Sequence, residues 1–113
     1  MIHERGTIIF AADPFKESDA GRPWVVVNTT DMPFHDEQCI AIALTSQTWI
    51  DERIPIHQDD VTNGKLPRKS SVLPWAIASI DPDDVRGVVG TLDSDIVDQA
   101  VRELVGYMGV RSN

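Results

Sequence analysis

The fold class rests on one heptapeptide, Gly21-Arg22-Pro23-Trp24-Val25-Val26-Val27. Its last four residues are β-branched or aromatic and predict a strand, which the glycine and proline separate from a preceding loop. Outward from this strand, apolar runs predict a strand over 7–10 and a strand buried on both faces over 39–44. Further short strands are predicted within 49–57, 71–78 and 85–89.

The spacing of the apolar residues changes in the C-terminal part of the chain. Its apolar residues recur at helical spacing and share one face, which predicts an amphipathic helix. These residues are Ile96, Val97, Ala100, Val101, Leu104, Val105 and Met108. Asp93 or Ser94 can cap the start of the helix, and Gly109 can close it. The sequence thus predicts a mainly β fold in which about six short strands form a barrel. The C-terminal helix is predicted to cover an open end or face of that barrel.

Composition places the chain in a broad class. Its 113 residues suffice for one domain, predicted to span 1–113, and are too few for two ordinary ones. The single cysteine, Cys39, excludes an internal disulfide and a cysteine cluster for zinc, and burial in a strand is favoured over a reactive thiol. No apolar run is long enough to span a membrane, and residues 1–6 lack a leader-like apolar stretch. A cytoplasmic protein is expected.

The charge balance has two interpretations. Eighteen acidic residues face ten basic ones, for a net charge of −8, and aspartate is much commoner than glutamate. Such a surface repels nucleic acid at low ionic strength, so one interpretation is a protein that avoids polyanions. The other is a halophilic surface, whose carboxylates retain water while concentrated salt screens their repulsion. We favour the halophilic interpretation.

The order of these features resembles that of a known toxin family. The opening Arg5-Gly6-Thr7-Ile8-Ile9, the following Asp13-Pro14 and the heptapeptide are similar to the start of MazF/PemK toxins. Later matches are the strand into Thr45-Ser46, then Ser71-Val72-Leu73-Pro74, Gly90-Thr91-Leu92 and the closing helix. The resemblance implies an SH3-like small β-barrel, a fold shared with gyrase-poisoning toxins, and therefore does not fix the chemistry. It also implies a homodimer and a cognate antitoxin protein as partner.

The best-studied family members are metal-independent ribonucleases that cut single-stranded RNA. Such cleavage requires the 2′-hydroxyl to lose a proton and the phosphorane charge to be stabilised. Arg22 is the best candidate for charge stabilisation, because a guanidinium stays charged and pairs with phosphate oxygens; the alternative is an ion pair with a nearby carboxylate. The resemblance implies that Thr45 bonds the substrate phosphate, with Ser46 in support. The alternative for both hydroxyls is turn capping at the strand end.

Other candidate substrate contacts are less specific. Some family members carry an Arg and an Asp where this chain has Leu73 and Trp75, which leaves the general base unassigned. Trp75 is a candidate to stack on a base, although packing in the core or the dimer interface is favoured. His3, His35 and His57 could serve as general base or acid, and His35 and His57 are candidate substrate-binding residues, although each is more often a solvated loop histidine. No spacing among the histidines and acids resembles a metal site, so neither metal nor cofactor is expected.

Three functions from different classes compete. The leading one is a type II toxin that cleaves single-stranded RNA by attack of the 2′-hydroxyl. The second is a degenerate family member that binds nucleic acid or a protein without cleavage, which Leu73 and Trp75 favour. A topoisomerase poison ranks last, because the helix lacks a distinctive aromatic terminus. A two-fold dimer that buries Trp75 or Trp49 is also predicted.

Overall fold

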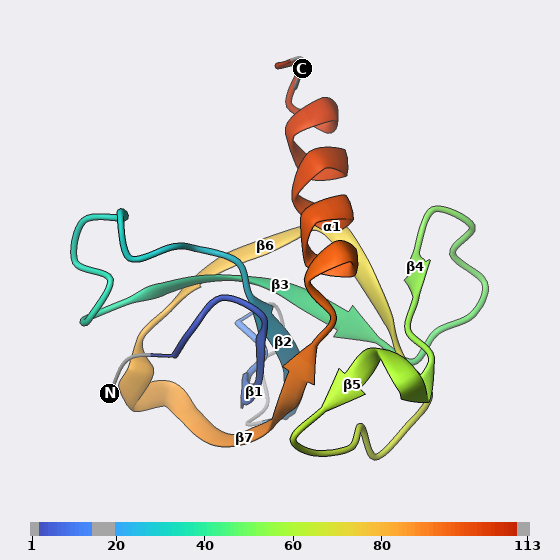
Figure 1. The fold of residues 1–113 in the computed structure, drawn as a ribbon, viewed down its shortest axis with the longest axis horizontal. Coiled ribbons are helices and arrows are strands. Elements are labelled where there is room, and N and C mark those ends of the chain that lie inside the picture. Colours follow the sequence, from blue (N-terminus) through green and yellow to red (C-terminus); the bar gives the residue numbers. More distant parts are fainter. Residues whose placement is uncertain (1–2, 15–19, 111–113) are drawn as a thin grey trace.

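A computed structural model describes residues 3–14 and 20–110 of the chain. Its strands form one antiparallel sheet that curls into a half-barrel, with a single C-terminal α-helix on one side (Figure 1). The sheet order is β4-β6-β3-β2-β1-β7-β5. The bounds are β1 Thr7–Ala12, β2 Gly21–Val26, β3 Cys39–Thr45, β4 Ile54–Pro55, β5 Val61–Thr62, β6 Ser71–Ile80, β7 Val85–Leu92 and α1 Ser94–Tyr107, with 3₁₀ turns at Gln58–Asp60 and Pro82–Asp84. The mainly β fold with one helix is confirmed.

The central strands are buried on both faces. Neighbouring residues point to opposite sides of the sheet, so Ile8 and Val25 enter one core cluster while Ile9 and Trp24 enter the other. All four side chains are completely buried. Each contributes roughly 1.5–3 kcal/mol relative to an exposed side chain. The strand predicted over 39–44 is observed as β3, and its doubly buried character is confirmed.

Strand β6 contains a bulge that accommodates a proline. Leu44 of β3 pairs with Val72, but Ile42 pairs with Ile77, so β6 has extra residues between these two pairs. Pro74 lies within that interval, where its missing N–H removes no ladder bond. The bend lets β6 extend to Ile80, beyond the predicted end at 78.

The helix α1 begins and ends as predicted. The Asp93 carboxylate accepts a hydrogen bond from the Asp95 amide at 2.8 Å, which caps the first turn. At the other end Gly109 adopts a φ of +89°, and the Val110 amide bonds the Val105 carbonyl at 3.3 Å. The helix packs through buried side chains on its inner face: Val97, Ala100 and Leu104. The C-terminal end of the helix extends beyond the sheet (Figure 1).

A tight turn at Asn63-Gly64 follows the short strand β5. Asn63 has a φ of 55° and Gly64 a φ of 154°, both in the region that favours such residues. A Cβ on Gly64 would lie 1.9 Å from the carbonyl oxygen of Val89, so the turn packs directly on β7. The polar loop predicted over 13–19 falls partly on residues 15–19, outside the described part of the chain. No helix in that part is long and apolar enough to cross a membrane.

Candidate functional site

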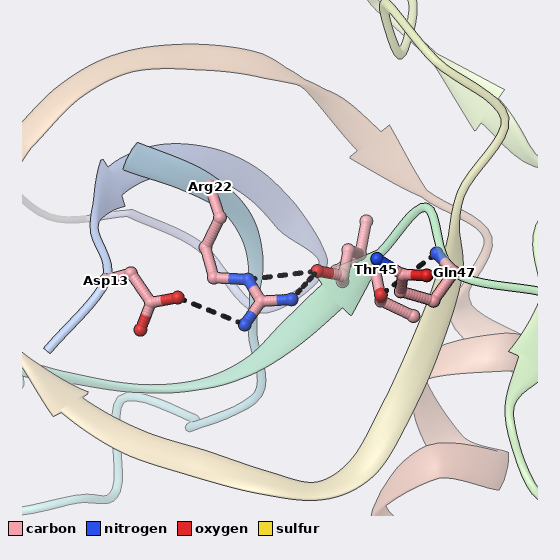
Figure 2. Close-up of polar contacts among 5 residues, drawn as sticks. Asp13, Arg22, Thr45 and Gln47 are labelled. Carbon is pink, nitrogen blue, oxygen red and sulfur yellow. Dashed lines mark hydrogen bonds and ion pairs between the residues drawn. The ribbon is translucent and has the colours of Figure 1, made fainter. Parts of the chain in front are cut away.

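The candidate site forms where strand β2 begins beside the end of β3. Trp24 pairs with Ala43, and Pro23, the next residue outward, cannot donate a ladder hydrogen bond. The Leu44 carbonyl instead accepts two bonds from Arg22, from Nε at 3.2 Å and from Nη2 at 2.8 Å (Figure 2). The guanidinium is thereby fixed against the residue that precedes Thr45. The structure thus brings together two predicted site residues, Arg22 and Thr45.

Asp13 holds the other side of the same guanidinium. Its Oδ2 lies 3.3 Å from Nη1 of Arg22, and its side chain is only 3% exposed (Figure 2). The contact follows from strand register. Arg22 pairs with Ala11, so Asp13 is its diagonal neighbour on the same face, within reach of a long side chain. A buried carboxylate is costly without a positive partner, and Arg22 supplies one.

The guanidinium retains capacity for a ligand. Arginine carries five N–H donors in a planar fork. Within the described residues, Arg22 uses three of them, on Nε, Nη1 and Nη2, which leaves one N–H on each terminal nitrogen. A quarter of its side chain is exposed. Two such donors on one rigid cation can pair with two oxygens of a phosphate or carboxylate.

Thr45 caps the turn that follows β3. Its Oγ1 accepts a hydrogen bond from the Gln47 amide at 3.1 Å, so the capping interpretation of this hydroxyl is realised (Figure 2). The hydroxyl hydrogen is still available as a donor, because capping uses only a lone pair. Thr45 is 6% exposed, whereas the next residue, Ser46, is exposed. The two hydroxyls therefore present one inner and one outer donor at this strand end.

Trp75 lies away from this group. Its ring packs edge-on against Tyr107 of α1, with centroids 5.9 Å apart at an angle of 76°. The buried residues of α1 belong to the same core cluster as Leu44. The Arg22 guanidinium lies 6.0 Å from the ring centroid of Trp24, which belongs to the other core cluster. The aromatic contact with the helix corresponds to the packing interpretation of Trp75.

The structure places the candidate histidines in two separate pockets. His35 lines a pocket of about 230 Å³ together with His3 and Arg5, and its Nδ1 lies 3.3 Å from the Met32 carbonyl oxygen. Burial, with a smaller effect of the N-terminal charge, lowers the pKa of His3. His57 lines a pocket of about 400 Å³ whose residues are all different. The two histidines therefore do not share a pocket within this chain.

The larger pocket is cationic and begins near the end of β3. Thr45 lies opposite Ser71 in the antiparallel pairing of β3 and β6. The exposed Ser46, which follows Thr45, is therefore near Ser70, which precedes Ser71 and lines the pocket. Arg68 and Lys69 also line this pocket, in a chain of net charge −8. Among the described residues, no group of three or more histidines, cysteines or acids could hold a metal ion.

Sequence reasoning missed Asp13 as a site residue. The sequence offers only an aspartate before a proline at the end of a strand, and that pattern is more typical of a turn. The burial of Asp13 and its ion pair depend on the β1–β2 register, which local residues do not reveal.

Fold and site together define a small curled β-barrel protein that presents an anchored guanidinium and two hydroxyls at one strand end. A family model described as PemK-like, MazF-like toxin of type II toxin-antitoxin system matches residues 4–106. The match spans most of the chain. The chain belongs to this family.

Solved structures share the fold over nearly the full length of both chains. An endoribonuclease in complex with its cognate antitoxin, from a Mycobacterial species, has a TM-score of 0.75 and 16% identity, covering 98% of this chain and 99% of that one. MazF from Deinococcus radiodurans has a TM-score of 0.72 and 15% sequence identity, and the match covers 97% of this chain and 99% of that one. A MazE–MazF structure from the same organism has a TM-score of 0.70 and 15% sequence identity, and the match covers 99% of each chain. At this identity the likeness concerns the fold. No curated protein is significantly similar in sequence.

Proposed function

We propose that this chain is a toxin component acting as a metal-independent endoribonuclease on single-stranded RNA. One observation carries the proposal: the guanidinium of Arg22 is fixed by Asp13 and by Leu44, the residue before Thr45, and keeps two further N–H donors. Family membership supports it, and relatives of the same fold are named endoribonucleases.

The proposed reaction is an attack of the 2′-hydroxyl oxygen on the adjacent phosphorus. The 2′-hydroxyl loses its proton as its oxygen bonds to phosphorus, and the leaving 5′-oxygen gains a proton as its bond to phosphorus breaks. The products are a 2′,3′-cyclic phosphate and a 5′-hydroxyl. Arg22 stabilises the charge that builds on the non-bridging oxygens, while Thr45 and Ser46 donate hydrogen bonds to the phosphate. The Asp13 carboxylate is occupied by Arg22, so its role is to position the guanidinium.

The cationic pocket extends this site along the RNA strand. We assign His57, Arg68 and Lys69 to a flanking phosphate, because their pocket is cationic and includes Ser70, the neighbour of the Thr45 partner Ser71. His35 and Trp75 stay predicted substrate contacts at a distance from Arg22. Where concentrated salt screens the acidic surface, these hydrogen bonds and stacking contacts carry most of the affinity.

A homodimer and a cognate antitoxin complete the proposal. Relatives of the same fold are known in complex with an antitoxin. The exposed apolar residues Trp75, Ile77, Tyr107 and Met108 on β6 and α1 support a two-fold pairing of this surface. Light scattering over a range of concentrations tests it, and a mass that stays that of one chain contradicts the dimer. Action in the cytoplasm, where messenger RNA is available, also belongs to this proposal.

The second candidate is a family member that binds without cleavage. Leu73 is buried and Trp75 packs on Tyr107, where some cleaving members carry an Arg and an Asp. Neither residue can transfer a proton to or from the RNA. This candidate therefore keeps the same surface but lacks part of the chemistry.

The deciding experiment incubates RNA with the purified chain in concentrated salt and a chelator. We expect discrete fragments that end in cyclic phosphate. Arg22→Ala should abolish them and Arg22→Lys should reduce them strongly, because an ammonium lacks the planar fork. Arg102→Ala, which removes an exposed arginine on the helix, is the matched control. Intact RNA from wild-type protein shown to be folded would refute cleavage and favour the non-cleaving candidate.

A further inference from the structure

Among the residues that the structure describes, Trp49 is the most exposed large apolar side chain, at 76%. It lies in the loop between β3 and β4, which extends from the sheet on the side opposite the loop between β2 and β3 (Figure 1). Tryptophan is normally buried for most of its surface, so a ring exposed to this extent leaves a large apolar face open to a ligand.

Hydrogen bonds link the Trp49 indole to the candidate site. Its Nε1–H donates to Gln47 Oε1 at 3.1 Å, and the Gln47 amide in turn donates to Thr45 Oγ1 at 3.1 Å. The indole N–H is the only hydrogen-bonding group on that side chain, and Gln47 already occupies it. What the exposed ring offers to a ligand is therefore its apolar π surface.

The ring lies within reach of a nucleotide near the scissile bond. Trp49 is four residues beyond Thr45, so their Cα atoms are at most about 14 Å apart. A nucleic acid strand advances roughly 3.4 Å per stacked nucleotide, which places the ring within a few nucleotides of Thr45.

The charges of the loop favour a base over a phosphate as the ligand. Asp51 and Glu52 are exposed in the same loop as Trp49, so this part of the surface repels phosphates. Stacking on an aromatic ring involves the uncharged base and needs no attraction to the backbone. An acidic protein can therefore bind a strand here through its bases.

We propose that Trp49 forms a nucleobase-binding subsite, on which a base flanking the cleaved phosphate stacks. The subsite rests on the proposed action on single-stranded RNA. Because every base has a π face, the subsite contributes affinity with little sequence preference, and Gln47 fixes the orientation of the ring relative to Thr45.

The test is a thermodynamic cycle that combines a protein change with removal of the bases. Fluorescein-labelled oligoadenylate and an abasic ribose-phosphate strand of the same length are titrated with the wild-type chain, Trp49→Ala and Trp49→Phe. Fluorescence anisotropy gives each Kd. Phe34→Ala is the matched control, because it removes a 64% exposed aromatic ring from the loop on the other side of the fold. Thermal melts establish that all variants are folded.

We expect Trp49→Ala to weaken oligoadenylate binding roughly 5- to 150-fold, the range of one lost stacking contact. Trp49→Phe should retain much of the affinity, and Phe34→Ala all of it. On the abasic strand, wild type and Trp49→Ala should bind equally. An equal loss on both strands, or no loss on either, overturns the subsite. Loss of dimer mass with unchanged RNA affinity also overturns it and assigns Trp49 to a protein interface.

The result is independent of whether the chain cleaves RNA. If the wild type leaves RNA intact but binds oligoadenylate in a Trp49-dependent way, the subsite stands and the nuclease proposal fails. If the wild type cleaves RNA and Trp49→Ala has unchanged Kd and KM, the nuclease stands and the subsite fails.

Discussion

The Asp13 carboxylate lies 3.3 Å from the guanidinium of Arg22, although the two residues belong to different segments joined through the β1–β2 pairing. One partner is almost completely buried and the other is a quarter exposed. The pair therefore has an inner end that fixes geometry and an outer end that solvent reaches. Leu44, which accepts two bonds from the same guanidinium, connects this pair to Thr45.

Asp13→Asn should lower kcat by about 100-fold with little change in KM. This is the size of effect expected when a catalytic group is displaced by about 1 Å. The amide keeps the shape of the side chain but removes the charge that orients Arg22. Single-turnover RNA cleavage measures the effect. Asp98→Asn is the matched control, because it removes the more exposed Arg5–Asp98 pair at 2.9 Å. Equal kcat values for both variants contradict a positioning role for Asp13.

Thr45→Val should lower kcat/KM by roughly 100- to 1000-fold, the range seen when one donor to developing charge is removed. Valine has nearly the same shape but neither donates to the phosphate nor caps Gln47. Thr45→Ser keeps the hydroxyl and should retain most of the activity. Steady-state kinetics on one RNA substrate separates the two variants, and a similar loss in both refutes a role for the hydroxyl.

Arg68 and Lys69 should contribute to the salt dependence of RNA binding. Each phosphate contact on a single strand adds roughly 0.7 to the slope of log K against log salt. Replacing both residues with alanine should reduce that slope by up to about 1.4. Lys65→Ala, in the same segment but not in the pocket lining, should leave the slope unchanged. The titration uses RNA with a 2′-deoxy nucleotide at the cleavage position.

Two glycine substitutions should change stability in opposite directions. Gly64→Ala places a Cβ 1.9 Å from the Val89 carbonyl oxygen and should shift the turn and destabilise the fold. At Gly106, inside α1, a Cβ meets nothing within 4 Å. Gly106→Ala should therefore stabilise the protein by about 0.5–1 kcal/mol. Urea denaturation measures both, and a more stable Gly64→Ala would contradict the close packing of the turn on β7.

The buried thiol of Cys39 should make the free energy of unfolding fall as the pH rises through the alkaline range. Burial raises the pKa of its thiol above the ordinary value of 9.0, an effect that a backbone hydrogen bond with Ile80 opposes in part. Above that value the unfolded chain loses the proton while the folded chain keeps it, so stability falls as pH rises. The difference in unfolding free energy between wild type and Cys39→Ala should hence shrink above about pH 9. A constant difference would contradict the burial of the thiol.

Much of the fold was predictable because it is local. The apolar run over 39–44 predicted β3, and the helical spacing after residue 93 predicted α1 with its capping residues. Boundaries were less accurate where pairing sets them. Strand β1 extends to Ala12, two residues beyond the prediction, because Ala12 pairs with Gly21 across the sheet.

The candidate site was predictable only in part. Arg22 and Thr45 were identified from residue chemistry and from the resemblance to the MazF/PemK family. Asp13 and Trp49 were not assigned to it. Their contributions depend on which atoms the folded chain brings within hydrogen-bonding distance.

The sequence by itself determined the strand-forming segments, the helix, the acidic surface and the family of this protein. The strands, the helix and the acidity follow from residue type and short-range period. The family follows from the order of motifs that resemble MazF/PemK toxins and from the matching family model. Only the tertiary structure decided that Arg22 meets Asp13 and Leu44, that His35 and His57 occupy separate pockets, and that the end of α1 extends beyond the sheet. The reason is physical. Arg22 and Leu44 are 22 residues apart in the sequence. A contact at that separation depends on the register of β2 against β3, which local residues alone do not set.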